Sequence, residues 1–213
     1  EPVDVSDSYC HLGIVCSKSL STKVNMQDAC TKLRGTYYSV VNGGIDVTSV
    51  NPIIVRTIYE AMVLPKAVYG CELWNTYSKQ DINNLEKAHR FCVKHMQQFL
   101  KSTSSYFSLY CINLVTIETF IDFKKLQLLC QLCRLPCRHL SKAVFVHRHV
   151  GFMNGDKQCV GFIPDIYKLL DKYQLVGYIL TFLKDALSPS CFLFSPYGER
   201  SSDNMFCSPI HSQ

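Results

Sequence analysis

The chain has 213 residues and a net charge of +5, and 47% of its residues are hydrophobic. This composition supports a sizeable folded core and excludes a chain that is disordered throughout. No apolar run approaches the roughly 18 to 20 residues of a membrane-spanning helix, so we expect no membrane partner.

The cysteines and the N-terminus indicate the cellular compartment. Twelve cysteines are spaced irregularly, and most lie inside apolar runs, where a free thiol packs as a small hydrophobe. The acidic start Glu1-Pro2-Val3-Asp4 is unlike a secretory signal peptide. We therefore expect an intracellular protein, in the cytoplasm or the nucleus. Because the sequence begins with Glu1 instead of Met, we also expect an upstream part of the protein.

Positive charge is concentrated in the middle of the chain. Residues 79–142 contain ten basic and four acidic residues, a balance of +6, and the rest of the chain therefore carries −1. Such a bias permits contact with phosphates. A polyanionic partner should accordingly meet this segment.

The N-terminal third predicts a short β-structure and two helices. Residues 11–16 form an apolar piece between polar residues, which is typical of one strand or one arm of a hairpin. From Val24 to Val41 the apolar residues recur at an imperfect helical spacing, and Asn42-Gly43-Gly44 ends this helix. A second helix is expected at about 51–69, where Pro65 must kink it or end it early.

The third predicted helix carries the clearest pattern. Ser78 and Asp81 offer a capping box at its start. An apolar stripe follows at alternating steps of three and four residues: Ile82, Leu85, His89, Cys92, Met96 and Phe99. Beside it runs a polar stripe at the same spacing, which places its members on one face of a helix that extends to residue 101: Asn83, Lys87, Arg90, Lys94, Gln97 and Lys101.

Two further helices are predicted before Pro136. A short one covers about 104–112, and a long one covers about 116–135, where Pro136 stops it. Residues 126–133 are apolar nearly all round the helix. We therefore expect this second half of the long helix to be deeply buried.

The C-terminal third predicts helices that are separated by a loop. We expect a helix near 140–150, a Gly-rich loop at 151–161, and a helical region that Pro164 opens and that reaches about Ala186. Residues 188–213 are rich in Ser, Pro and polar residues, which predicts a disordered tail.

One group of cysteines and histidines has some character of a zinc site. It contains a CxxC pair followed by further potential ligands: Cys130, Cys133, Cys137, His139, His147 and His149. Zinc requires four S or N ligands in a tetrahedron, and CxxC is a usual half-site. The pair lies within a helical apolar run, however, and the second half lacks the spacing of a zinc finger. We therefore expect these cysteines to pack in the core and no structural metal to bind.

Asp165, Asp171 and Lys172 have some character of a metal-dependent nuclease site. Such sites need an acid, one intervening residue and then a lysine, so that both side chains of a strand reach one metal. Asp171 and Lys172 are adjacent, which on a strand directs them to opposite faces. Asp165 is explained more simply as the acid that the dipole favours in the first turn of a helix.

Other catalytic motifs are missing from the sequence. It contains neither a Gly-rich phosphate loop nor the strand-to-helix serine elbow of hydrolases. Two-metal nucleotidyl transfer needs carboxylates that converge on both ions, and Asp46, Asp122 and Asp165 have no obvious partners. We interpret His89, on the apolar stripe, as a hydrogen-bonded core histidine. No catalytic residue, metal site or cofactor is therefore expected.

Several short segments follow one another over roughly residues 9–187: His11-Leu12-Gly13-Ile14, residues 64–70, Glu72-Leu73-Trp74, residues 85–90, residues 113–118, residues 121–136 and residues 161–166. Together, and in this order, they resemble the region after the palm in reverse transcriptases of LINE-type retrotransposons. These are packing motifs. The family's Phe/Tyr-x-Asp-Asp metal site would lie upstream of Glu1, and its zinc-knuckle spacing has no match here.

This resemblance implies a C-terminal fragment of an RNA-directed DNA polymerase. The expected fold is mainly α, a thumb-like helical bundle that follows a short β remnant of the palm. Residues 1–45 would be the end of a palm-like segment with its connecting helix, residues 46–187 the thumb-like and downstream bundle, and residues 188–213 the tail. The parent polymerase would use Mg²⁺, but no catalytic position carries over to this chain, so the fragment alone should have no polymerase activity.

The expected function is binding to the backbone of RNA or DNA, weakly and with strong salt dependence. The candidate contacts are the cations of the polar stripe, namely Lys87, Arg90, Lys94 and Lys101. The alternative for this stripe is an ordinary solvated surface. Two other functions stay open for the whole chain. It could be a helical protein-interaction module whose aromatic-rich residues 104–135 form a partner groove, or a degenerate product without retained function.

Overall fold

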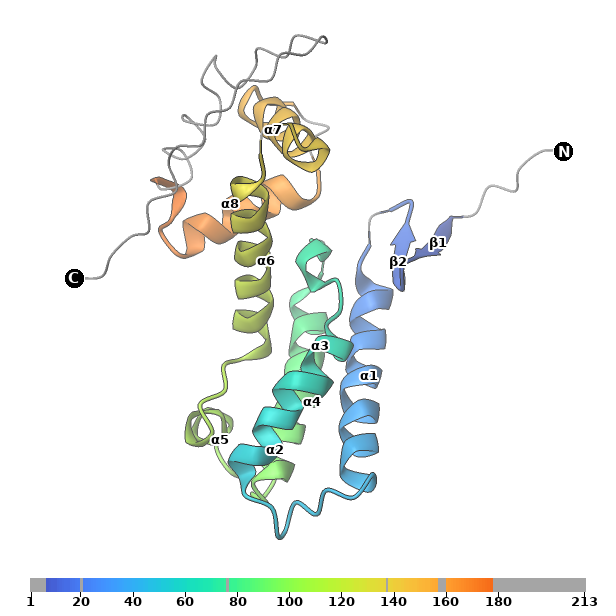
Figure 1. Cartoon of the computed structure of the whole chain (residues 1–213), viewed down its shortest axis with the longest axis vertical. Helices are drawn as coiled ribbons and strands as arrows, with labels where there is room; N and C mark the ends of the chain where they lie inside the picture. Colours follow the sequence, from blue (N-terminus) through green and yellow to red (C-terminus); the bar gives the residue numbers. More distant parts are fainter. Residues whose placement is uncertain (1–6, 20, 76, 137, 157–159, 178–213) are drawn as a thin grey trace, which may run out of the picture.

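The computed structural model describes residues 7–19, 21–75, 77–136, 138–156 and 160–177. The protein is mainly helical and has one small antiparallel sheet, as predicted (Figure 1). The expected tail at 188–213 lies outside the described residues.

The sheet is a hairpin of β1 (Ser8–His11) and β2 (Ile14–Ser17), in which Ser8 pairs with Ser17 and His11 with Ile14. Between them Leu12 and Gly13 have φ of 49° and 81°. Two positive φ values in a two-residue loop match the twist of a hairpin. The prediction of a single strand or arm across 11–16 is therefore wrong, because the turn divides this run.

Helix α1 (Lys23–Asn42) forms as predicted and buries one apolar stripe: Met26, Ala29, Leu33 and Tyr37. The next helical segment consists of α2 (Pro52–Ile58), a π-helical turn (Tyr59–Val63) and α3 (Leu64–Ala67). Pro65 does not end this helical segment but lies in the first turn of α3. A wider π turn, in which Leu64 N–H donates to Tyr59 O, comes directly before Pro65, which has no N–H to donate.

Helix α4 (Lys79–Met96) begins with the predicted capping box of Ser78 and Asp81. It ends five residues earlier than predicted. Gln98 has φ of 56°, while Phe99 N–H donates to Lys94 O and Gln98 N–H to His95 O. This pattern is a Schellman motif, whose left-handed position is usually glycine. Because this position is a glutamine, the sequence does not indicate that the helix ends here.

The two predicted helices before Pro136 are present as α5 (Ser105–Cys111) and α6 (Ile117–Arg134), and Ser104 and Thr116 cap them. The expected deep burial of residues 126–133 is wrong. Only Leu129 is buried in this segment, and Cys130 is exposed. Helices α7 and α8 cover part of the circumference of α6, so the remaining apolar side chains stay half-buried or exposed.

The last described helices are α7 (Leu140–Met153) and α8 (Phe162–Lys172). Helix α7 continues into the expected Gly-rich loop, of which residues 157–159 lie outside the described residues. Helix α8 starts before Pro164 and ends at Lys172. A second Schellman motif ends it, with Gln174 at φ 57° and Leu175 N–H donating to Leu170 O. Residues 176–177 are helical again, and the rest of the expected helical region, as far as Ala186, lies outside the described residues.

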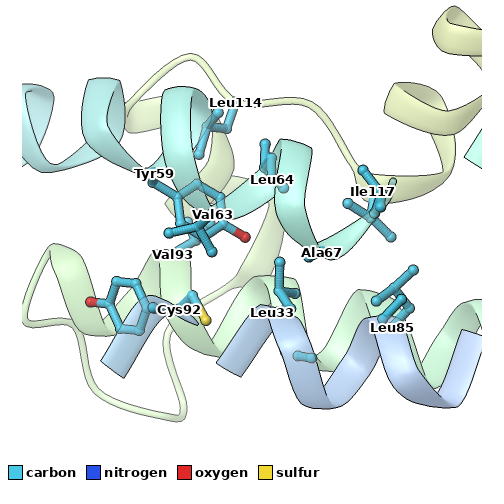
Figure 2. Close-up of a cluster of buried hydrophobic side chains, with 14 of the residues drawn as sticks. Leu33, Tyr59, Val63, Leu64, Ala67, Leu85, Cys92, Val93, Leu114 and Ile117 are labelled. Carbon is cyan, nitrogen blue, oxygen red and sulfur yellow. The ribbon is translucent and has the colours of Figure 1, made fainter. Parts of the chain in front are cut away.

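Two apolar clusters hold these helices together, and α6 contributes to both. Side chains of α1, the segment from α2 to α3, α4 and the start of α6 form the larger one (Figure 2). Leu129 of α6 packs with α7 and α8 in the smaller one. Figure 1 shows α6 leading from the first group of helices to α7 and α8. The outer face of α4 and the short α5 remain at the surface of the larger group.

Candidate nucleic-acid interface

A hollow of about 350 Å³ lies at the surface between the second half of α4 and the start of α5. We call it the basic hollow, and it is defined by its lining residues: Lys87, Arg90, Phe91, Lys94, His95, Phe99, Lys101 and Ser105. None of these lining residues is acidic. The four predicted cations therefore meet at one place on the surface.

The four cations were predicted to lie on one helix, but the structure places only three of them on α4. Lys87, Arg90 and Lys94 lie along one face of α4, as their spacing requires. Lys101 is not on this helix, because the Schellman motif has already ended it. The chain folds back instead, and Lys94 Nζ donates a hydrogen bond to Lys101 O at 3.0 Å. The turn thereby returns Lys101 to the rim of the hollow.

Arg90 is held in place on two sides. Its Nε donates to Glu86 Oε1 at 2.8 Å, and its guanidinium lies 5.7 Å from the centre of the Tyr106 ring. Glu86 is buried, so its carboxylate offsets part of the Arg90 charge. Within the described residues, Lys87, Lys94 and Lys101 form no ion pair. These three lysines carry the uncompensated charge of the hollow.

Aromatic rings also line the basic hollow. The Phe91 and His95 rings stack with their centres 6.2 Å apart, and Tyr37 O–H bonds His95 Nδ1 at 2.8 Å. The guanidinium of Arg34, from α1, lies 6.0 Å from the centre of the Phe91 ring. A fifth cation thus stands beside the hollow.

The sequence interpretation missed Phe91, His95 and Arg34. Phe91 and His95 could have been found, because they flank Lys94 in a helix that was already assigned. Nothing in the sequence signals Arg34, since its place depends on how α1 packs against α4.

A second hollow of about 600 Å³ lies on the neighbouring side of α5 and the following loop. We call it the aromatic hollow, and its lining residues are Tyr106, Phe107, Leu109, Tyr110, Leu114, Val115, Thr116 and Thr119. It falls within residues 104–135, where a partner groove was expected.

Asp122 and Asp165 are paired with basic and hydroxyl groups. Asp122 accepts hydrogen bonds from Lys172 Nζ at 2.7 Å and Tyr173 O–H at 3.0 Å, and Asp165 pairs with the buried Lys125. Lys172 is partly buried, which lowers its pKa, but Asp122 and Glu118 raise the pKa above its usual value. These pairs join α8 to α6, and they explain both aspartates structurally.

The positions of the other candidate acidic residues also have structural explanations. Asp46 accepts hydrogen bonds from Thr48 and Ser49, which lower the pKa of its carboxyl. Asp165 lies in the first turn of α8, as predicted. Asp171 is exposed at the end of that helix.

His89 is a hydrogen-bonded core histidine, as predicted. Tyr59 O–H bonds its Nδ1 at 2.7 Å, and its Nε2 bonds Val115 O at 3.1 Å. Burial lowers the pKa of its ring. The ring therefore links α4 to the π turn and to the loop before α6.

The potential zinc ligands are dispersed. The prediction that the CxxC pair packs in the core is wrong for Cys130, which is exposed on α6, whereas Cys133 is half-buried. His149 is buried in α7 and bonds Tyr167 O–H. Among the described residues, no group of three or more His, Cys, Asp or Glu side chains could hold a metal ion, and Cys137 lies outside them.

No protein-family model, curated protein or solved structure matches this chain. In the described parts of the chain, no helix combines the length and the apolar character that crossing a bilayer requires.

Proposed function

We propose that this chain binds the phosphate backbone of RNA or DNA through the basic hollow, weakly and with strong salt dependence. One observation carries the proposal: four cations line a single hollow whose lining contains no acidic residue. Phosphates pair with lysine and arginine side chains and release the counterions that surround the strand. We further propose that the chain is a thumb-like fragment of a LINE-type reverse transcriptase, without polymerase activity of its own.

The number of cations sets the expected salt dependence. Three uncompensated lysines, with or without Arg90, correspond to three or four phosphate contacts. The log–log salt slope for a single strand should then be about −2 to −3. Affinity should fall roughly 20- to 50-fold between about 50 and 200 mM salt.

The test replaces the three uncompensated lysines together: Lys87→Gln, Lys94→Gln and Lys101→Gln. Arg90 is left in place, because its loss would leave the buried Glu86 without its cation. The matched control changes three exposed lysines outside the hollow: Lys23→Gln, Lys66→Gln and Lys168→Gln. Both variants lose the same charge, so only the position of the charge differs.

Binding is measured by the fluorescence anisotropy of a labelled strand over a range of salt concentrations. We expect the hollow variant to bind all sequences more weakly with a flatter salt slope, and the control to bind like the parent. Equal losses in both variants would show that net charge alone attracts the strand. No binding by the parent at about 20 mM salt, where counterion release favours it most, would overturn the proposed function.

A protein-interaction module is the second candidate, because α5 leaves large apolar side chains at the surface of the aromatic hollow. A protein partner would bury these side chains, and its affinity would depend little on salt. If the parent bound neither a strand nor a protein, a product without retained function would be favoured.

A further inference from the structure

The short helix α5 exposes three aromatic rings. Tyr106 is 73% exposed, Phe107 54% and Tyr110 84%. All three line the aromatic hollow, together with Val115, which is 51% exposed. An apolar surface of this kind generally marks an interaction site.

Two contacts join this aromatic hollow to the basic hollow. Arg90, in the basic hollow, lies over the ring of Tyr106, in the aromatic one. Phe99, in the basic hollow, stacks on Phe107, in the aromatic one, with ring centres 5.8 Å apart. The cations and the exposed rings therefore form one continuous surface.

This surface is fixed in position. Gln97, in the cap of α4, donates to Ser108 O at 2.8 Å, and the hydroxyl of Ser108 donates to Ser104 O at 2.8 Å. Leu109 and Ile112 are buried in the larger apolar cluster. The rings are consequently presented on an anchored element, and little ordering is required when a ligand binds.

We propose that the joined surface binds an unpaired polynucleotide strand, with its phosphates on Lys87, Lys94 and Lys101 and its bases stacked on Tyr106 and Tyr110. This inference rests on the proposed function and specifies its ligand. A groove of cations beside exposed rings is the combination that single strands require, because every unpaired base has a free π-face. In a duplex those faces are already stacked inside the helix. The cations beside the rings favour a polyanion over an apolar protein partner.

The test uses a labelled oligo(U) strand of about 12 nucleotides, within the range of single-strand site sizes. A strand of equal length without bases and a duplex of the same length are compared with it, and oligo(dT) separates RNA from DNA. The parent is compared with a variant that carries Tyr106→Ala and Tyr110→Ala. Both rings are exposed, so the variant should retain the thermal unfolding midpoint of the parent.

Two further variants serve as controls. Tyr106→Phe with Tyr110→Phe keeps the rings and should bind like the parent. Tyr9→Ala with Tyr69→Ala removes two tyrosines that are 64% and 58% exposed outside both hollows, and it should also bind like the parent.

We expect the alanine variant to lose at least about fivefold in affinity for each ring, while its salt slope stays unchanged. The parent should bind the strand without bases and the duplex more weakly than oligo(U). When a fluorescent base analogue such as 2-aminopurine is placed in the strand, the parent should quench its fluorescence, and the alanine variant should quench it much less.

Three outcomes would overturn the inference. The first is that the alanine variant binds oligo(U) like the parent protein, and the parent binds the strand without bases like oligo(U), while the lysine variant binds weakly. The bases then do not stack on the tyrosines, but the proposed role of the basic hollow is retained. If no strand binds at about 20 mM salt, the proposed function fails as well. If the alanine variant changes only the oligomeric state in light scattering, the aromatic hollow is covered by a second copy of the chain.

Discussion

The carboxylate of Glu86, buried in α4, accepts a hydrogen bond from the backbone N–H of Ile117, the first residue of α6, at 2.8 Å. Its other oxygen accepts from Arg90. The N-terminal N–H groups of a helix lack partners within the helix, and a carboxylate there also interacts favourably with the helix dipole. One side chain thus caps α6 and holds the arginine of the basic hollow.

The Glu86→Ala variant should therefore be clearly destabilised. It leaves a backbone donor and a partly buried guanidinium without their acceptor, so the free energy of unfolding should fall by about 2–4 kcal/mol. Glu86→Gln keeps one acceptor oxygen and should cost less. Urea unfolding measures both. Glu60→Ala, which breaks the more exposed pair with Arg56, should cost under about 1 kcal/mol. Equal costs at positions 60 and 86 would contradict the capping role of Glu86.

Two glycines should respond to alanine in opposite directions. Gly70 has φ of +72°, and a Cβ there would lie 2.5 Å from the Cδ1 of Ile14 in β2. Gly70→Ala should lower the free energy of unfolding by about 1–2 kcal/mol. Gly35 lies inside α1 with nothing within 4 Å of its Cβ position, so Gly35→Ala should raise it by about 0.5–1 kcal/mol. Thermal unfolding of both variants checks this, and the same sign for both would refute the geometry.

Stability should decrease in mild acid because of His89. Burial holds the pKa of its ring below the value of about 6.5 that it has when unfolded. As the pH falls through about 6.5, the unfolded chain binds more protons than the folded one, so acid favours unfolding. Above that pH this residue adds no pH dependence. The urea concentration at the midpoint of unfolding should therefore decrease as the pH is lowered from about 8 to about 5.

Two histidine variants separate this effect from other titrations. His89→Gln should be less stable at pH 8, because it disturbs two hydrogen bonds, but its decline toward pH 5 should be smaller. His147→Gln changes an exposed histidine and should keep the decline of the parent. A decline of the same size in all three proteins would assign it to other groups.

The isolated chain should not extend a primer on an RNA template with Mg²⁺ or Mn²⁺. Nucleotidyl transfer needs carboxylates that place two metals, whereas Asp122 and Asp165 each have a lysine partner. The assay measures incorporated nucleotides, and adding an active polymerase to the same mixture excludes an inhibitor. Template-dependent incorporation by a pure sample would refute the prediction.

The chain should also need no structural metal. Bound structural zinc contributes directly to folding free energy, so a strong chelator would unfold a domain that depends on it. We expect the chelator to leave the helical circular dichroism of this chain unchanged. Elemental analysis should find far less than one zinc per chain. Stoichiometric zinc, or unfolding on addition of the chelator, would contradict this prediction.

The starts of α4 and α6 were predictable from the sequence because they depend on hydrogen bonds between near neighbours. Ser78 accepts from the N–H of Asp81, and Thr116 from that of Thr119, each within one turn. The apolar stripes of α1 and α4 were predictable for a similar reason, since the helical repeat alone decides which side chains share a face. Mainly helical architecture followed from these local signals, as did the grouping of Lys87, Arg90 and Lys94.

Only the tertiary structure decided the surroundings of these cations. Glutamine at position 98 takes a left-handed conformation that is usually glycine's, and this turn brings Lys101 back to the hollow. Arg34 reaches Phe91 from another helix, and Glu86 bonds a residue 31 positions later. Such contacts join segments that are distant in the sequence, and their free energy depends on how the helices pack. Hydrogen bonds within one turn specify where a helix begins, but the packing between helices determines what lies beside each face.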